Sequence, residues 1–189
     1  MHIPNQAHPI PVVSIVGKGD SGKTTFLEKL IAEFASRGFK VATVKHHVHD
    51  YDIDVPGKDS WRHARAGAVA TMVSSPDKFA LIRQVERELT LPQIAGIAAD
   101  AGCDLLLTEG FKREGVNRVE VSRAARSEEL ICESGEMLAL VTDNPALAGE
   151  GGTMREAGVS CFGLDDAPGV ADLIIGSFGV ALPGSEGGA

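Results

Sequence analysis

A glycine-rich stretch near the start of the chain has the composition of a phosphate-binding loop. The residues GKGDSGKTT, from Gly17 to Thr25, follow the spacing G-x-x-x-x-G-K-[ST]. In such a loop the backbone wraps a triphosphate, a lysine bridges the β- and γ-phosphates, and a hydroxyl binds Mg²⁺. We expect Lys23 and Thr24 to play these two parts. The other phosphate contacts would come from Gly17, Gly19, Asp20, Ser21, Gly22 and Thr25. The alternative is a glycine-rich turn with a solvated lysine.

An acidic residue follows an apolar run further along the chain. A phosphate-binding loop needs a carboxylate at the end of a neighbouring strand to hold Mg²⁺ directly or through water. The segment DLLLTEGFK supplies Glu109 at such a place, whereas Asp104 lies at the other end of the same run. We therefore predict Glu109 as a metal residue. The competing interpretation is a surface glutamate that opens a turn at Gly110.

The densest polar segment is KHHVHDYDIDVPGKDSWRHARAG, residues 45–67. It holds four of the six histidines, and it starts where an expected strand ends, at the sheet edge where ligands bind in open α/β folds. Asp52 and Asp54 could join the Mg²⁺ shell or orient a water molecule. Lys58, Arg62 and Arg65 are spaced as one face of a helix and would form an anion-binding stripe. His46 and His47 could assist that stripe in holding a pterin phosphate or a partner's acidic surface.

Two other interpretations of this segment stay open. Imidazole and carboxylate ligands suit zinc or nickel, although His-His-x-His in an extended loop has no fixed ligand geometry. The segment could also be a solvated loop, since its four basic side chains balance its four aspartates.

Base selectivity depends on one aspartate. Guanine-specific proteins with this loop usually place an aspartate after a late strand, and LVTDNP offers Asp143 there. The full N-K-x-D pattern is absent, and Asp143 could equally form a turn before Asn144 and Pro145. The residues alone leave GTP and ATP open.

The surrounding sequence predicts a three-layer α/β domain with a mostly parallel sheet. Apolar runs indicate strands at 11–16, 39–44, 68–74, 79–84, 104–108, 119–122 and 137–142, several of them apolar on both faces. Helical spacing or helix-start signals indicate helices at 23–37, 58–66, 92–101 and 168–175. Around 111–123 and 126–135 the pattern is weak, and a hairpin or an edge strand is as plausible as a helix. We expect one domain over residues 11–178, a flexible start over 1–10 and a disordered tail over 179–189.

Composition narrows the partners. The 18 basic and 26 acidic side chains give a net charge of -8, which opposes nonspecific attraction to nucleic acid or anionic membranes. No apolar run reaches the ~20 residues of a membrane span, and the first ten residues do not resemble a signal peptide, so we expect a cytoplasmic protein. Three widely separated cysteines predict neither a disulfide framework nor a cysteine zinc site.

Three stretches together resemble the molybdopterin-guanine dinucleotide biosynthesis protein B family. They are GKGDSGKTT, KHHVHDYDIDVPGKDSWRHARAGA and TEGFKR, and the middle stretch is the specific one. The similarity covers about residues 11–144. It implies a dimeric GTP-binding protein that hydrolyses GTP weakly at best and assists the guanylyltransferase attaching GMP to molybdenum cofactor. Matching the motifs implies that Gly22, Lys23, Thr24 and Thr25 hold phosphates and Mg²⁺, with Asp54 and Glu109 near the metal.

Two other functions remain as alternatives. A small-molecule kinase would use the same loop with an arginine-bearing lid, and the region after Glu109 carries Lys112, Arg113, Arg118, Arg123 and Arg126. The histidines also allow a nickel- or zinc-insertion GTPase. Weak hydrolysis is compatible with the residues, because no glutamine or arginine is evidently placed to orient water and neutralise the γ-phosphate.

Overall fold

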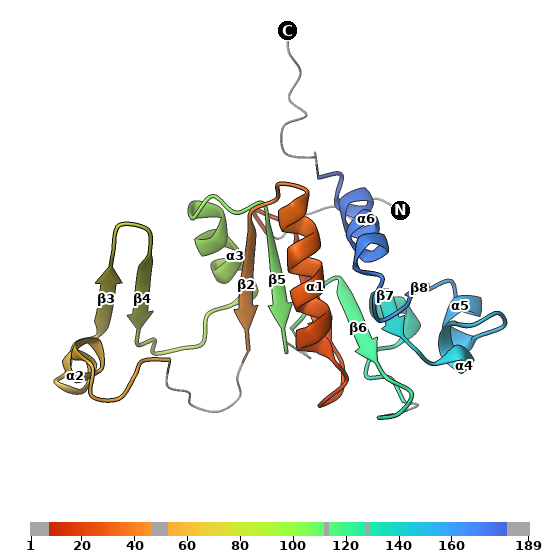
Figure 1. Ribbon diagram of the computed structural model, residues 1–189, viewed down its shortest axis with the longest axis horizontal. Helices are drawn as coiled ribbons and strands as arrows, with labels where there is room; N and C mark the ends of the chain where they lie inside the picture. Colours follow the sequence, from red (N-terminus) through yellow and green to blue (C-terminus); the bar gives the residue numbers. More distant parts are fainter. Residues whose placement is uncertain (1–7, 47–52, 112–113, 128, 181–189) are drawn as a thin grey trace, which may run out of the picture. The chain divides into compact units, whose positions relative to one another are not determined.

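Six β-strands with apolar side chains form a parallel sheet in the larger part of the molecule. The computed structural model describes residues 8–46, 53–111, 114–127 and 129–180. The strands are β1 (Val12–Val16), β2 (Val41–Lys45), β5 (Leu105–Glu109), β6 (Arg118–Ser122), β7 (Met137–Thr142) and β8 (Ser160–Phe162). Their spatial order is β2-β5-β1-β6-β7-β8, and every neighbouring pair is parallel (Figure 1). Strand β1 is therefore central, with β5 on one side and β6 on the other.

Helices cover both faces of this sheet. Helices α1 (Lys23–Ser36) and α6 (Ala167–Phe178) share one hydrophobic core with Val13 and Ile15 of β1. Val12 and Leu106 point to the opposite face and pack with Ala95 of helix α3 (Leu91–Asp100). Because side chains alternate along a strand, a β1 that is buried at every position needs helices on both sides. The predicted three-layer α/β fold is confirmed.

The remaining elements of this part of the chain are short. They are the 3₁₀ turn η1 (Ser134–Glu136) and helices α4 (Pro145–Ala148) and α5 (Thr153–Glu156). The strand predicted at 119–122 is confirmed as β6, and it lies in the interior of the sheet and not at its edge, which was one expectation for the region 111–123. Its neighbours on both sides explain why four of its five residues are buried. Residues 126–135 hold neither a helix nor a strand in the part of them that the structure describes, apart from the start of η1.

The residues that follow β2 and precede α3 in the sequence form a second compact unit. The chain divides into one unit of residues 1–46 with 91–189 and another of residues 47–90. The second unit holds α2 (Asp59–Arg65) and an antiparallel hairpin of β3 (Ala70–Ser74) and β4 (Phe79–Arg83). The predicted strands 68–74 and 79–84 are thus present, but they form a separate hairpin. The single domain over 11–178 stays a prediction.

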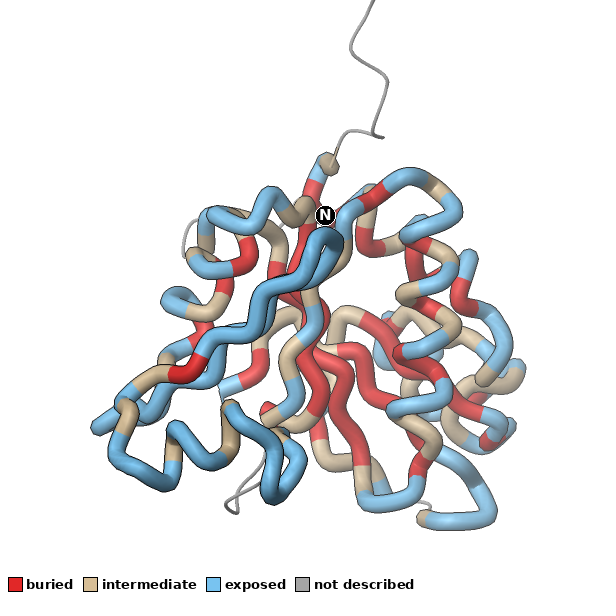
Figure 2. The backbone as a smooth tube through the Cα atoms, turned by 60° about the vertical axis from the view of Figure 1, so that its left-hand side comes forward, coloured by how far each residue is buried: buried red, intermediate tan, exposed pale blue. Residues whose placement is uncertain are grey.

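The hairpin exposes most of its residues, while buried residues follow the strands of the larger sheet (Figure 2). Every residue of β4 is exposed. Among the described residues, no helix is both long and apolar enough to cross a lipid bilayer.

Candidate nucleotide-binding site

The loop between β1 and α1 has the backbone that its glycines allow. Gly17 and Gly22 have φ of 144° and 92°, and Asp20 has φ of 57°. A Cβ atom at Gly17 would lie 2.3 Å from the carbonyl oxygen of Val121 in β6, so the loop passes too close to that strand for any side chain. The buried Ser21 hydroxyl has no hydrogen-bond partner among the described residues. This tight loop, with an unsatisfied hydroxyl, fits a phosphate-binding role.

Lys23 lies at the first turn of α1, where the helix dipole favours an anion. Its Nζ donates a hydrogen bond of 2.6 Å to the carbonyl oxygen of Lys18 in the same loop. Helix α1 begins directly from the loop, since the amide of Phe26 donates to the carbonyl oxygen of Gly22. The lysine and the first turn of the helix are thus part of one rigid strand-loop-helix unit.

The structure brings Thr24 and Glu109 together. Thr24 Oγ1 donates a 2.9 Å hydrogen bond to Glu109 Oε1, and Lys45 Nζ lies 3.7 Å from the same oxygen. Glu109 ends β5 and is 9% exposed, while Asp104, before the start of β5, accepts from the amide of Lys40. The parallel register of β1 and β5, which pairs Ile15 with Glu109, fixes this carboxylate beside the loop.

The oxygen pair fits Mg²⁺. Thr24 Oγ1 and Glu109 Oε1 lie 2.9 Å apart, so one ion could contact both oxygens. A hydroxyl and a carboxylate are also the hard oxygen donors that this ion prefers. Thr24 and Glu109 would therefore hold the metal, either both directly or Glu109 through a water molecule.

A depression of about 490 Å³ lies over the loop. Its lining comes from the loop, from the first turn of α1 and from the ends of the strands: Asp20, Gly22, Lys23, Thr24, Thr25, Lys45, Glu109 and Arg123. Three cationic side chains face two carboxylates here, so the depression suits a phosphate group with its metal ion. The arrows of β2, β5 and β6 point to the edge where α1 begins (Figure 1), the edge at which open α/β sheets bind ligands.

Arg123 is a residue of this depression that the sequence analysis did not place there. It was one of several basic residues considered for a lid, and of these Lys112 and Arg113 lie outside the described residues. Arg118 pairs with Glu136, 2.9 Å away, at the other end of β6. In the sequence, Arg123 follows directly after an expected strand, which could have indicated a place at the ligand-binding edge. That inference needs the knowledge that β6 is a neighbour of β1.

The segment after β6 is joined to the loop by polar contacts. Arg126 Nη2 lies 3.0 Å from Asp20 Oδ2, and Lys18 Nζ donates to Ser127 Oγ at 2.7 Å and to Glu129 at 3.0 Å. The hydrogen bond from Lys18 lowers the pKa of Glu129. These contacts hold residues 123–129, apart from the undescribed residue 128, beside the loop.

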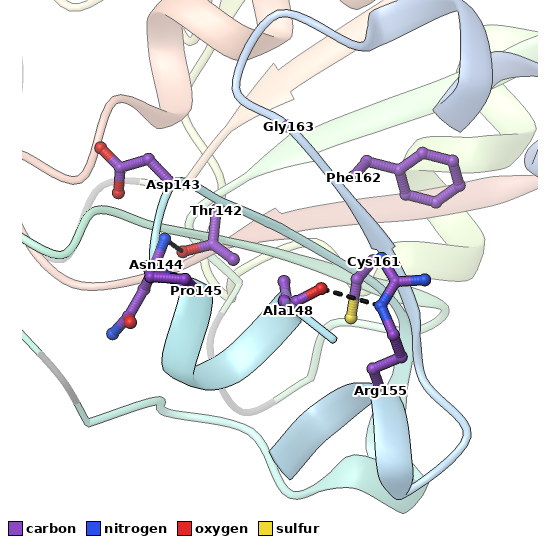
Figure 3. Close-up of a pocket in the computed structure, with 10 residues that line it drawn as sticks. Thr142, Asp143, Asn144, Pro145, Ala148, Arg155, Cys161, Phe162 and Gly163 are labelled. Atoms are coloured by element: carbon purple, nitrogen blue, oxygen red, sulfur yellow. Dashed lines mark hydrogen bonds between the residues drawn. The ribbon is translucent and has the colours of Figure 1, made fainter. Parts of the chain in front are cut away.

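Asp143 follows β7, at the carboxyl edge of the sheet. Its Oδ1 accepts a 2.8 Å hydrogen bond from the amide of Ala124, directly after Arg123. A smaller depression of about 240 Å³ lies beside it, lined by residues from Thr142 to Gly149 together with Arg155, Cys161, Phe162 and Gly163. Its side chains are drawn in Figure 3, where the carboxylate of Asp143 points away from Arg155 and Cys161. One carboxylate oxygen is therefore already engaged by the backbone.

The predicted residues of the polar segment divide between the two units. His46 follows β2, its amide donates to the carbonyl oxygen of Glu109, and its ring packs on Phe111 at 4.7 Å between centroids. Asp54 belongs to the second unit, where its Oδ1 accepts hydrogen bonds of 2.9 Å from Val55 N and from Ser60 Oγ. The structure therefore brings Thr24 and Glu109 together and leaves the place of Asp54 relative to them undetermined. His47 and Asp52 lie outside the described residues.

The basic stripe is present at the start and along the length of α2. Lys58 is the N-cap of α2, Arg62 lies 3.8 Å from Asp59, and the guanidinium of Arg65 lies 5.3 Å from the ring centre of Trp61. Arg62 and Arg65 thus each have a partner on their own helix. Among the described residues, no three His, Cys, Asp or Glu side chains gather as a metal site, so the zinc or nickel interpretation gains no support from them.

The comparisons with known proteins agree on one family. The family model described as "Molybdopterin guanine dinucleotide synthesis protein B" matches residues 12–143. A protein of Escherichia coli K12 named "Molybdopterin-guanine dinucleotide biosynthesis adapter protein" is 33% identical over 171 residues, which are 88% of this chain and 92% of that protein. A protein of the same name from Haemophilus influenzae is 34% identical over 136 residues, 72% of this chain and 76% of that protein. Among solved structures, MobB of Bacillus subtilis superimposes with a TM-score of 0.69 at 27% identity, over 89% of this chain and 98% of that one.

Proposed function

The chain belongs to the molybdopterin guanine dinucleotide synthesis protein B family, and we propose that it is a GTP-binding adapter in molybdopterin guanine dinucleotide biosynthesis, with Mg²⁺ as its metal and a guanylyltransferase as its partner. The observation that carries the nucleotide part is the 2.9 Å contact between Thr24 and Glu109 beside Lys23. A hydroxyl and a nearly buried carboxylate, placed together beside the lysine of the loop, are the groups that a bound nucleotide with its Mg²⁺ would use.

Binding is the main task of this site, and hydrolysis is weak. Among the described residues, those that line the depression include no glutamine, the residue type that orients the attacking water molecule in many GTPases. Glu109 Oε1 accepts a hydrogen bond from Thr24 and lies 3.7 Å from Lys45 Nζ, so this carboxylate is not poised to act as a general base. A protein with such a site binds the nucleotide and hydrolyses it slowly.

Guanine selectivity is assigned to the edge of the sheet at Asp143. This residue and the depression beside it follow β7 and β8, on the side of the loop away from Glu109. Asp143 Oδ1 holds the amide of Ala124, which leaves Oδ2 as the acceptor for a base. Loss of guanine selectivity in Asp143→Asn, with phosphate binding retained, is the result that supports this role.

The hairpin of the second unit supports a homodimer. Met72 and Leu81 are opposite each other in its register and therefore share one face with Phe79, and these three side chains are 54–65% exposed. A lone two-stranded hairpin is marginal in water, and a face with three large apolar side chains is unfavourable when exposed. A second copy of the chain offers the same apolar face as a match.

The partner contacts are assigned to the segment around α2. Lys58, Arg62 and Arg65 make this short element basic along its length, in a protein whose net charge is -8. Such a stripe suits the phosphate of molybdopterin or an acidic surface of the guanylyltransferase. Arg62→Ala and Arg65→Ala together should weaken binding of the pterin or of the enzyme.

A reconstituted reaction tests the adapter role. Guanylyltransferase, molybdopterin and Mg²⁺ with limiting GTP are incubated with the unaltered protein, with Lys23→Ala or with Lys29→Ala, and the dinucleotide formed is measured. Lys29 is the matched control, because it lies on the same helix but pairs with Asp165 on the surface. Stimulation by the unaltered protein and Lys29→Ala but not by Lys23→Ala supports the proposal, whereas equal yields with and without the protein contradict it.

A further inference from the structure

The guanidinium of Arg123 lies directly above the loop glycine that precedes Lys23. A Cβ atom at Gly22 would lie 3.0 Å from Arg123 Nε and 3.2 Å from its Nη2. Arg123 also lines the depression over the loop. We propose that Arg123 is a further phosphate-binding residue of this site, that it acts on the phosphates remote from Mg²⁺, and that it contributes equally to GTP and GDP binding. This inference depends on the nucleotide binding proposed above.

Sheet order places Arg123 on the side opposite the metal residues. Strand β5, which ends at Glu109, pairs with one edge of β1, and β6, which ends just before Arg123, pairs with the other. The registers pair Ile15 with both Glu109 and Val119, so both neighbours extend to the level of the loop. Mg²⁺ bridges the β- and γ-phosphates, and its expected ligands Thr24 and Glu109 lie on the β5 side. A cation on the β6 side therefore meets the α-phosphate end of the chain of phosphates.

Hydrogen bonds hold the backbone of Arg123 in place. Its carbonyl oxygen accepts from the amides of Arg126 and Ser127 at 2.9 and 3.2 Å, which closes a turn. The next amide, Ala124 N, donates to Asp143 Oδ1. Arg126 then pairs with Asp20 of the loop. The backbone of Arg123 is thus fixed beside the phosphate site, and ligand binding has to order only its side chain.

The head group of Arg123 is available to an anion. Across the described ranges, the guanidinium of Arg123 has no hydrogen bond or ion pair, and the side chain is exposed. Asp165 is a carboxylate near enough to feel its charge, since Arg123, after Lys29, helps to lower the pKa of Asp165. Arg126 differs, because Asp20 already occupies it. A planar guanidinium can give two parallel hydrogen bonds to a phosphate, which a lysine at the same place cannot do.

Calorimetric titration with Mg²⁺-GTP and Mg²⁺-GDP tests the proposal. The proteins compared are the unaltered chain, Arg123→Ala, Arg123→Lys and, as a control arginine, Arg37→Ala. Arg37 follows the last residue of α1, at the end of the helix away from the loop, and pairs with Glu33 and Asp172. A charge-assisted hydrogen bond predicts a loss of roughly 10- to 100-fold for Arg123→Ala, the same for GTP and GDP within about threefold. Arg123→Lys should recover part of the loss, and Arg37→Ala should change binding by less than about threefold.

Several results would overturn it. A loss confined to GTP would place Arg123 at the γ-phosphate. Unchanged binding in Arg123→Ala would show that this residue does not contact the nucleotide. An equal loss in Arg37→Ala would show that only the net charge of the protein matters. Failure of the unaltered protein to bind either nucleotide would refute the nucleotide site and the role of Arg123 together, whereas the other outcomes refute only the role of Arg123.

Discussion

Replacing Glu109 with glutamine isolates the charge that the site offers to Mg²⁺. Glutamine keeps the size of the side chain and an oxygen that can accept from Thr24 Oγ1, now 2.9 Å away. The apo protein should lose little stability, at most about 1 kcal/mol, since the ion pair of Oε1 with Lys45 is long, at 3.7 Å, and the Lys45 side chain is more than half exposed. Binding of Mg²⁺-nucleotide should fall much more, because one of its two protein oxygens would no longer be charged.

The size of that loss follows from the role of the oxygen. Removing a directly or indirectly coordinating group typically costs about 10- to 100-fold in metal affinity, or about 1.4 to 2.7 kcal/mol. GTP titrations over a range of Mg²⁺ concentrations would show the half-saturating Mg²⁺ concentration rising by that factor. Asp104→Asn is the matched control, because this carboxylate lies next to the other end of β5 and holds the Lys40 amide. An unchanged Mg²⁺ requirement in Glu109→Gln, or an equal change in Asp104→Asn, would refute the assignment.

Three further predictions concern folding, association and reactivity. Gly17→Ala should lower the free energy of unfolding by about 2 kcal/mol or more in chemical denaturation. The reason is that its Cβ would lie 2.3 Å from Val121 O, at a φ of 144°. The control Gly19→Ala should be nearly neutral, because no atom lies within 4 Å of a Cβ at that position. Light scattering should give the unaltered chain twice its 19.8 kDa mass. The double variant Phe79→Ser with Leu81→Ser should be a monomer, while the control Lys78→Ser should remain a dimer. A monomeric unaltered chain would contradict the hairpin interface. Burial, with the charge of Glu120 as the second cause, raises the pKa of Cys132 to about 12. The thiolate fraction of Cys132 at pH 8 is therefore about a thousandfold below that of a thiol of pKa 9. Alkylation followed by mass spectrometry should show that Cys132 is protected in the folded protein, and rapid labelling would contradict this prediction.

The sequence was sufficient for the elements that local pattern determines. Strand β1, the glycine loop and α1 were predicted to within a few residues, because apolar β-branched residues, glycines and helical spacing follow one another without interruption. Glu109 was placed at a strand end because the apolar run before it is continuous, and the structure puts it against Thr24.

Features that depend on strand order were out of reach of the sequence. Arg123 follows β6, and only the pairing of β6 with β1 brings it to Gly22. The same limit applies to Asp143, whose contact with the Ala124 amide joins residues 19 positions apart. The strands at 70–74 and 79–83 have the composition of buried strands, yet they form an exposed hairpin, since composition does not report which partner covers a face.

The most direct test of the central claim is calorimetric titration of the purified protein with GTP, ATP and GDP in Mg²⁺, beside Lys23→Ala. We predict that GTP and GDP bind in preference to ATP. Affinity should be lost in Lys23→Ala, because the variant lacks the lysine at the start of α1 that would contact the phosphates. Equal or tighter binding of ATP would contradict the guanine-nucleotide adapter and favour a kinase that uses the same loop. Binding that persists unchanged in Lys23→Ala would contradict the site itself.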